Sequence, residues 1–203
     1  MISICCDFDG TITSRDSIVF LTENYGGGHR FRSDALTRIQ SGEWSVCEAI
    51  ENELASVKIP WEEVVPVLKK EITVDPFFDS FVSWTRQQEI SLRIVSSGMR
   101  SVIELFVGHL GLEVYAHSVE IDTDGWHYRA DPKMMKDRVL AKVRSDVEQL
   151  VYIGDGTSDL CAIPYADHLF AKRYLAKHCE ENSICYYPFD TFDDVRSQLQ
   201  RIF

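Results

Sequence analysis

The feature that most constrains the fold is an alternation of short apolar runs with segments typical of helices. After Pro76, runs at 91–95, 149–153 and 168–171 are separated by such helical segments. Strands that alternate with helices in this way form a parallel sheet with helices on both faces. The sequence therefore predicts an α/β fold with a doubly wound, Rossmann-like parallel sheet.

The first strand is followed by a long segment of different character. The apolar run at 2–6 stops abruptly at an Asp-Phe-Asp-Gly segment and is typical of a buried strand that ends at a loop. From about Asp16 to Glu71, apolar residues recur at helical spacing and no convincing strand is present. We therefore expect a core domain of residues 1–15 and 77–203, with a helical subdomain of residues 16–76 inserted after the first strand.

A short hairpin is predicted around Asp124-Gly125, a pair typical of tight turns between strands. Its second arm, Trp126-His127-Tyr128, is expected to pack against the protein, and such a flap can border a site. No internal repeat or low-complexity linker interrupts this organisation.

Composition limits both the size of the fold and the kind of ligand. With 203 residues and 45% apolar content, the chain can bury a core for one domain with an inserted subdomain. The net charge of −11 argues against a nucleic-acid partner, because such binding depends on Lys and Arg neutralising phosphates. The same charge opposes an anionic substrate unless a bound cation inverts the field inside one cleft.

The first residues and the cysteines indicate the compartment. The opening segment, MISICCDFDG, lacks the basic stretch and the long apolar run of a signal peptide. No segment approaches the roughly 20 apolar residues of a membrane span. The six cysteines include no CxxC pair, and adjacent Cys5 and Cys6 are expected to point to opposite faces of a strand. We expect a soluble, cytoplasmic monomer or homodimer with no membrane partner.

Polar residues follow three of the predicted strands at the point where each ends. Asp7 and Asp9 follow the first strand, Ser96 follows the strand at 91–95, and Asp155 and Asp159 follow the strand at 149–153. Ligands of open α/β sheets bind outside these carboxyl ends, so the side chains are expected to meet. Four carboxylates in one small volume repel one another unless a cation neutralises them, and oxygen ligands favour Mg²⁺.

Structural roles are the alternative for several of these residues. A single Asp at a strand end is commonly a turn residue or a helix cap, and this applies to Asp155 and Asp159 taken alone. Ser96 and Ser97 can cap the following helix, which is compatible with phosphate binding by the same residues. Asp7 and Asp9 are harder to explain structurally, because acids two residues apart project the same way from an extended chain.

Four segments carry the candidate chemistry, in the order Asp7-Phe8-Asp9-Gly10-Thr11-Ile12-Thr13, Ser96, Lys136 and Gly154-Asp155-Gly156-Thr157-Ser158-Asp159. They span nearly the whole chain and resemble, in order, the four motifs of the haloacid dehalogenase superfamily. The helical block resembles the first (C1) type of cap in the phosphoserine-phosphatase-like branch of that superfamily. Two further segments are Leu110-Gly111-Leu112 and Phe170-Ala171-Lys172-Arg173-Tyr174-Leu175. They are similar to the methionine-salvage phosphatases that act on 2-hydroxy-3-keto-5-methylthiopentenyl-1-phosphate.

This resemblance implies a magnesium-dependent phosphatase with a phosphorylated aspartate. Asp7 is then the nucleophile, and Asp9 protonates the leaving oxygen and later deprotonates the attacking water. The Asp7 carboxylate, the Asp9 carbonyl and Asp155 are expected to hold Mg²⁺. Gly10 and Thr11, next to the nucleophile, are expected among the phosphate-binding residues.

The resemblance also implies a phosphate-binding set after the second strand. Ser96 is expected to hydrogen-bond a phosphoryl oxygen, with the backbone N–H groups of Ser97 and Gly98 close by. Lys136 adds a fixed positive charge beside Asp7. Asp159 is expected to support Lys136 or the waters of the metal.

The choice of lysine has one alternative, Lys133, three residues before Lys136. Lys136 is preferred because the helical segment that begins with Asp137 follows it, as a helix follows the motif lysine of the family.

Two acids of the helical block bear on the substrate. Asp16 falls where phosphoserine phosphatases place an acid that contacts the substrate. Glu53 aligns with the arginine that grips the carboxylate of phosphoserine in those enzymes, and two like charges there repel. Arg38 or Lys58 could supply the missing charge, and Glu53 could instead face solvent on an amphipathic helix. A neutral polyol, keto or diketo phosphate, or an aminated one, is therefore preferred to phosphoserine.

The predicted function is hydrolysis of a small phosphate monoester, with a methionine-salvage keto phosphate as one candidate. Phosphoserine, sugar phosphate and pyridoxal phosphate are alternative substrates, and phosphotransfer between metabolites stays open. A receiver-like signalling module is the non-enzyme alternative. It is disfavoured because receiver domains lack an acid at the position of Asp9 and have no inserted subdomain.

Overall fold

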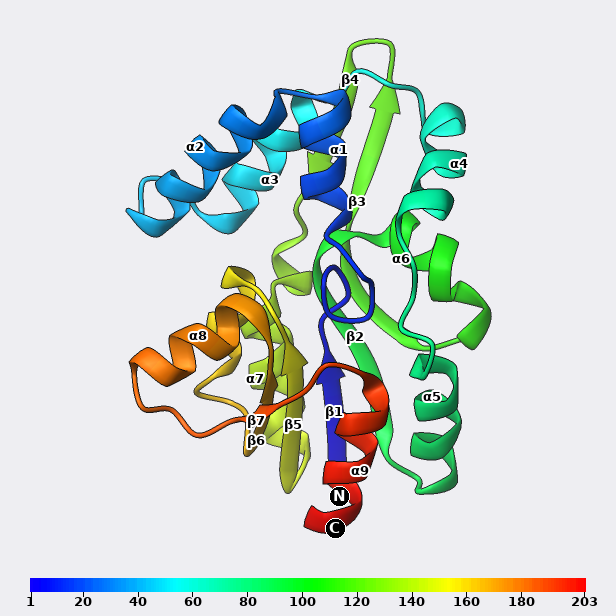
Figure 1. Cartoon of the computed structure of the whole chain (residues 1–203), viewed down its shortest axis with the longest axis vertical. Helices are drawn as coiled ribbons and strands as arrows, with labels where there is room; N and C mark the ends of the chain where they lie inside the picture. Colours follow the sequence, from blue (N-terminus) through cyan, green and yellow to red (C-terminus); the bar gives the residue numbers. More distant parts are fainter.

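The computed structural model describes all 203 residues. A seven-stranded sheet in the order β4-β3-β2-β1-β5-β6-β7 forms its centre (Figure 1). All neighbouring strands are parallel except β3 and β4, which form an antiparallel hairpin. The predicted α/β fold with a doubly wound sheet is confirmed. The strands are β1 (Ile2–Cys6), β2 (Ser91–Met99), β3 (Glu113–Asp122), β4 (Gly125–Arg129), β5 (Gln149–Gly154), β6 (His168–Ala171) and β7 (Tyr187–Pro188).

Helices cover both faces of the sheet because its strands are apolar on both sides. Ile4 and Cys6 of β1 pack in one hydrophobic cluster with α5, α6 and α9, whereas Cys5 packs in a second cluster with α7 and α8. Adjacent Cys5 and Cys6 therefore point to opposite faces, as the sequence predicts. The helices are α5 (Phe78–Gln87), α6 (Arg100–Val107), α7 (Lys136–Asp146), α8 (Arg173–Glu181) and α9 (Phe192–Ile202), with short 3-10 turns η1 (Gly108–Leu110), η2 (Pro132–Met134) and η3 (Thr157–Ala162).

Five helices lie between β1 and β2, and the first four of them form a helical insertion beyond the carboxyl end of β1 (Figure 1). Local signals set their ends. Asp16 accepts hydrogen bonds from the first turn of α1, and Ser45 and Glu48 form a capping box at α3. The glycines at 26–28 lie where α1 ends and α2 begins. These helices are α1 (Ser17–Tyr25), α2 (Gly28–Gln40), α3 (Val46–Ala55) and α4 (Trp61–Glu71).

The two connections between the helical insertion and the sheet run side by side. Thr13 and Val74 form an antiparallel bridge. The Ser14 N–H donates to the carbonyl of Thr73 at 2.8 Å, and the Asp75 N–H donates to the carbonyl of Ile12 at 2.9 Å. The chain thus leaves and re-enters the core at one place.

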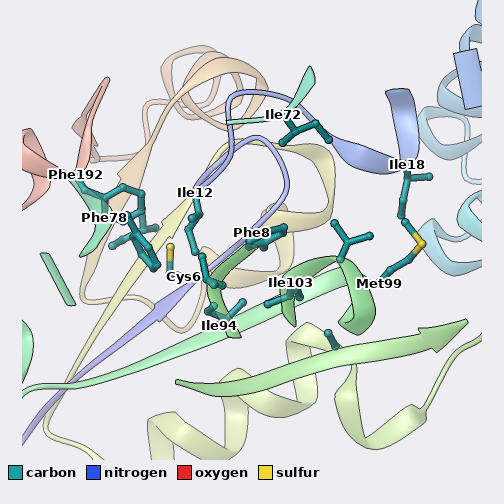
Figure 2. Packing of buried hydrophobic residues seen from close by; sticks show 14 of the residues in the cluster. Cys6, Phe8, Ile12, Ile18, Ile72, Phe78, Ile94, Met99, Ile103 and Phe192 are labelled. Atoms are coloured by element: carbon teal, nitrogen blue, oxygen red, sulfur yellow. The ribbon is translucent and has the colours of Figure 1, made fainter. Parts of the chain in front are cut away.

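The hydrophobic core continues from the sheet into the helical insertion. Figure 2 shows Ile18 of α1 facing Met99 at the end of β2, near Phe8 and Ile103. The same cluster includes residues of α3 and α4, so these helices are packed onto the core rather than tethered to it. None of the helices combines the length and the apolar composition that crossing a membrane requires.

β3 is continuous from Glu113 to Asp122, because the whole segment pairs first with β2 and then with β4. One strand was not predicted from the sequence. β7 has only two residues and is an edge strand, too short to leave a sequence signal. The predicted hairpin at Asp124-Gly125 is present.

Candidate active site

Asp7 lies directly beyond the carboxyl end of β1. Its backbone N–H donates to the carbonyl of Ile153 at 2.9 Å, which holds the residue as a continuation of the sheet. The residue is 5% exposed, and its Oδ1 accepts from Lys136 Nζ at 2.6 Å. The chain then turns at Gly10 with a φ of +79°, where a Cβ would lie 2.5 Å from the carboxylate of Asp155. Glycine is needed here, since any side chain would push the two acidic loops apart.

A buried lysine joins the first and the last of the predicted acids. Lys136 begins α7, and its Nζ also donates to Oδ1 of Asp159, which is fully buried. The Asp159 carboxylate further accepts from the Tyr152 hydroxyl at 2.6 Å and from two backbone N–H groups after β5 at 2.9 and 2.8 Å. Both oxygens of Asp159 are therefore occupied, which suits a residue that positions Lys136. Lys133 is exposed and lines a different groove.

Asp155 is held by a threonine and an arginine. Its Oδ1 accepts from Thr11 Oγ1 at 2.9 Å, and its Oδ2 accepts from Arg173 Nη1 at 3.1 Å. Thr11 Oγ1 also lies 3.4 Å from Oδ2 of Asp7, and Arg173 also donates to the carbonyl of Gly10 at 3.0 Å. The side chain of Thr11 and the turn at Gly10 therefore support the carboxylates, and neither residue lines the cavity described below.

Asp9 presents one free carboxylate oxygen to the site. Its Oδ1 accepts from the backbone N–H of Ser17 at 2.8 Å, at the start of α1. Its Oδ2 is buried and has no hydrogen-bond partner. Burial, and then the nearby charge of Asp16, raises the pKa of Asp9 to about 7. A Cβ on Gly98 would lie 2.4 Å from this oxygen, so only glycine leaves room for it.

Ser96, Ser97 and Gly98 form a bulge in β2. Val95 pairs with Tyr115 and Met99 pairs with His117, so four residues along β2 correspond to only two along β3. The extra residues leave the ladder at the carboxyl end of the strand, where they line the cavity. Ser96 Oγ accepts from the Gly98 N–H at 2.9 Å, so the hydroxyl and the backbone are organised together.

The electrostatics of this cluster suit a divalent cation. Burial, and then the charge of Asp159, raises the pKa of Asp7, whereas Lys136 lowers it. Burial, and then Asp159, raises the pKa of Asp155 to about 6. Asp7, Asp155 and Asp159 each offer an oxygen within 4.8 Å of the others. Asp7 and Asp155 line the cavity described below whereas Asp159 does not, so Asp7 and Asp155 are the side chains that fit a hard cation such as Mg²⁺.

A cavity of about 310 Å³ connects this cluster to the helical insertion. The carboxylates and the β2 bulge form one end of the cavity, and α1, α2 and α3 form the other. The far wall is largely apolar but carries three charged side chains, those of Asp16, Arg32 and Glu53. Its apolar members are Ile18, Val19, Leu36, Ile39, Val46, Ala49 and Ile50.

Glu53 and Arg32 form an ion pair in this wall. The Glu53 side chain is only 3% exposed, and Arg32 Nη1 lies 2.9 Å from its Oε1. Burial raises the pKa of Glu53 to about 7, although Arg32 lowers it. Glu53 thus lines the cavity rather than facing solvent. Arg38 and Lys58, the cations considered from the sequence, lie elsewhere: Arg38 pairs with an acid on the surface, and Lys58 donates to a carbonyl of the β3–β4 turn.

Asp16 serves first as a helix cap. Its Oδ1 accepts from the backbone N–H groups of Ile18 and Val19 at 2.8 and 2.9 Å, and the residue also lines the cavity. Asp16 is thus both a helix cap and part of the cavity wall.

The comparison with protein families agrees with this geometry. Residues 4–164 match the haloacid dehalogenase-like hydrolase family, a segment that contains the complete carboxylate cluster. The chain belongs to the haloacid dehalogenase-like hydrolases. It is therefore an enzyme, and the family resemblance stated from the motifs is confirmed. Solved structures of the family share the fold: a phosphoserine phosphatase with a phospho-aspartyl intermediate analogue matches with a TM-score of 0.76 and 17% identity, over 98% of this chain and 97% of that one.

Three curated relatives cover almost the whole chain of this haloacid dehalogenase-like hydrolase. Pdp3-interacting factor 1 of Schizosaccharomyces pombe is 37% identical over 97% of this chain and 94% of its own length. Polyol phosphate phosphatase PYP1 of Saccharomyces cerevisiae is 29% identical over 98% and 92%. The 2-hydroxy-3-keto-5-methylthiopentenyl-1-phosphate phosphatase of Bacillus cereus is 29% identical over 98% and 96%.

Sequence reasoning missed three residues that shape this hydrolase site. Arg173 and Tyr152 hold Asp155 and Asp159, and Arg32 pairs with Glu53. Arg173 lies in the segment Phe170–Leu175 that drew attention by resemblance, but without a role. Tyr152 lies within an apolar strand and Arg32 within a polar helix, so neither stands out in the sequence.

Proposed function

We propose that this chain is a magnesium-dependent phosphatase that hydrolyses a small phosphate monoester through a phosphorylated Asp7. The observation that carries the proposal is the pairing of Asp7 with Asp9 in one cavity. Asp7 is fixed by Lys136, while Asp9 keeps a buried Oδ2 without a partner. A buried polar atom without a partner is costly and indicates a ligand that supplies one. The names of two relatives, both phosphatases, support the same reaction.

Each residue of the site has a role in this reaction. Asp7, Asp155 and the Asp9 carbonyl would hold Mg²⁺, which when bound supplies positive charge against the phosphate dianion. Asp7 attacks phosphorus and forms an acyl phosphate, while Asp9 gives its proton to the leaving oxygen. Asp9 then takes a proton from the water that attacks the acyl phosphate, which releases inorganic phosphate and restores Asp7. Lys136 adds a positive charge beside Asp7 throughout.

The bulge after β2 supplies the phosphate-binding groups. Ser96, Ser97 and Gly98 line the same cavity as Asp7. The Ser96 hydroxyl and the backbone N–H groups of Ser97 and Gly98 would bind the phosphoryl oxygens. Asp159 keeps Lys136 in place through its buried carboxylate, because every oxygen of that carboxylate is already engaged. Binding and positioning thus come from separate groups.

The helical insertion acts as a cap that selects the leaving group. Its wall carries two acidic side chains, Asp16 and Glu53, and one arginine, Arg32, which is paired with Glu53. An anionic leaving group such as that of phosphoserine finds no free cation there. A neutral polyol can donate hydroxyls to the carboxylates, and a keto phosphate with an apolar tail fits the apolar residues. The polyol and the methionine-salvage keto phosphatases among the relatives support these two classes.

We further propose a cytoplasmic location. All six cysteines are unpaired, which suits a reducing compartment.

The reaction is tested by phosphate release from an aryl phosphate in wild type and Asp7→Asn. Turnover is expected in wild type with Mg²⁺, to stop with EDTA and to return when Mg²⁺ is restored. Asp7→Asn should lose activity by at least about 1,000-fold, since covalent catalysis is removed. Asp122→Asn, an exposed acid at the end of β3, is the matched control and should retain activity. Substantial activity in Asp7→Asn, or indifference to chelation, contradicts the proposal.

The substrate class is tested by comparing glycerol phosphate, a keto phosphate and phosphoserine. Wild type should hydrolyse a phosphate with a neutral leaving group with a kcat/KM at least about tenfold higher than that for phosphoserine, which corresponds to about 1.4 kcal/mol. Glu53→Arg should shift this ratio toward phosphoserine. A wild-type preference for phosphoserine contradicts the proposal that the wall of the helical insertion disfavours an anionic leaving group.

A further inference from the structure

The hairpin of β3 and β4 reaches the phosphate-binding bulge through one buried tyrosine. Tyr128 of β4 is 4% exposed, and its hydroxyl donates to the carbonyl of Ser97 at 2.8 Å. Ser97 is the central residue of the bulge, where the ladder with β3 is interrupted. The hydrogen bond therefore holds the Ser97 carbonyl in a part of β2 that is not held by pairing with β3.

The ring of Tyr128 packs against a buried histidine. Its ring and that of His117 of β3 form a T-shaped pair, with ring centroids 5.3 Å apart and an interplanar angle of 65°. His117 is 1% exposed, and its Nδ1 accepts from the Asp131 N–H at 3.1 Å. On the same arm of the hairpin, Trp126 Nε1 donates to the carbonyl of Ile59 at 2.8 Å. The hydroxyl of Tyr128 is thus a donor in a rigid frame.

Because the peptide is trans, the contact with Tyr128 also sets the direction of the Gly98 N–H. The C=O of Ser97 and the N–H of Gly98 belong to one planar peptide and point in opposite directions. When the carbonyl is held toward Tyr128, the N–H is directed the other way, where it donates to Ser96 Oγ. A rotated peptide would direct a carbonyl oxygen into the cavity, where it would repel a phosphate.

We propose that Tyr128 is a positioning residue that orients the Ser97–Gly98 peptide for phosphate binding. This inference rests on the proposed function, because it assumes that the bulge binds the phosphoryl group. Tyr128 itself does not line the cavity and acts only through the backbone it holds.

The test compares Tyr128→Phe with Trp126→Phe. Each substitution keeps an aromatic ring in the same buried arm of the hairpin and removes one hydrogen bond to a carbonyl, but only Tyr128 faces the bulge. Binding of inorganic phosphate in the presence of Mg²⁺ is measured by calorimetry, and turnover of an aryl phosphate is measured alongside. Tyr128→Phe should weaken phosphate binding and lower kcat/KM by about tenfold each. Trp126→Phe should lower the Tm but leave phosphate affinity within twofold of wild type.

Three results would overturn the inference. Phosphate affinity could be unchanged in Tyr128→Phe, it could fall equally in both variants, or wild type could fail to bind phosphate. The second result would assign the effect to hairpin packing alone. Absence of turnover in a wild type that binds phosphate contradicts the proposed function instead, and the affinity comparison still decides the role of Tyr128.

Discussion

Replacing Glu53 by Gln should stabilise the protein at alkaline pH, although the substitution breaks an ion pair. Burial raises the pKa of Glu53 from its ordinary value of 4.5 to about 7, after the opposing effect of Arg32. At about 1.4 kcal/mol per pKa unit, the charged carboxylate therefore lowers the free energy of unfolding by roughly 3 kcal/mol above pH 7. Gln has the shape of the neutral acid and avoids this penalty.

The pH dependence follows from the direction of the shift. Between pH 4.5 and about 7, folded Glu53 binds a proton that the unfolded chain releases, so stability falls as the pH rises through this window. The favourable contribution of the neutral acid is fully present below pH 4.5 and is lost above about pH 7. The difference between Glu53→Gln and wild type should therefore be near zero at pH 4.5 and roughly 3 kcal/mol in favour of the variant at pH 8.

The assay is urea unfolding of both proteins at several pH values. Arg32 is 23% exposed, so its guanidinium reaches water when the carboxylate is removed and is not left as an isolated buried charge. Glu43→Gln is the matched control, because Glu43 pairs with Arg38 on the surface and should change stability by less than about 1 kcal/mol at every pH. A Glu53→Gln variant that is less stable than wild type at pH 8, or a difference that is constant with pH, would refute the reasoning.

Two further substitutions test the catalytic end of the cavity. Gly98→Ala places a Cβ 2.4 Å from Asp9 Oδ2, so we expect kcat to fall by about 100-fold or more with the Tm nearly unchanged; full activity would show that Asp9 moves freely. Asp159→Asn removes the buried negative partner of Lys136, and a loss of about 3–5 kcal/mol in the free energy of unfolding is expected. A loss below about 1 kcal/mol in urea unfolding would mean that Asp7 alone can hold the lysine.

The strand ends were predictable from the sequence because apolar runs stop abruptly at polar residues. Asp7, Asp9, Ser96 and Asp155 accordingly meet at one edge of the sheet, as the order of strands in a doubly wound fold requires. Lys136 was separable from Lys133 only through the resemblance, since the two lysines lie three residues apart at the start of the same helical segment. In the structure Lys136 is buried against Asp7, whereas Lys133 is exposed.

Contacts between distant segments were not predictable. Arg32 and Glu53 lie 21 residues apart on different helices, and their pairing depends on how α2 packs on α3. Arg173 reaches back to Gly10 across 163 residues. The hydrogen bond from Tyr128 to Ser97 depends on the exact register of β3 with β4 and on the bulge in β2. Hydrophobic periodicity carries no information about such pairings.

The paired connections at residues 12–14 and 73–75 make the chain enter and leave the helical insertion at one place. Because Ser14 and Thr73 are bonded to each other, a foreign helical segment could replace everything between them without altering the spacing of β1 and β2. Substrate preference can therefore diverge by exchange or drift of this segment while the hydrolytic machinery below stays the same. Such a replacement must match the tip of the β3–β4 hairpin, which contacts the insertion through Trp126, and the apolar core on which Ile18 packs.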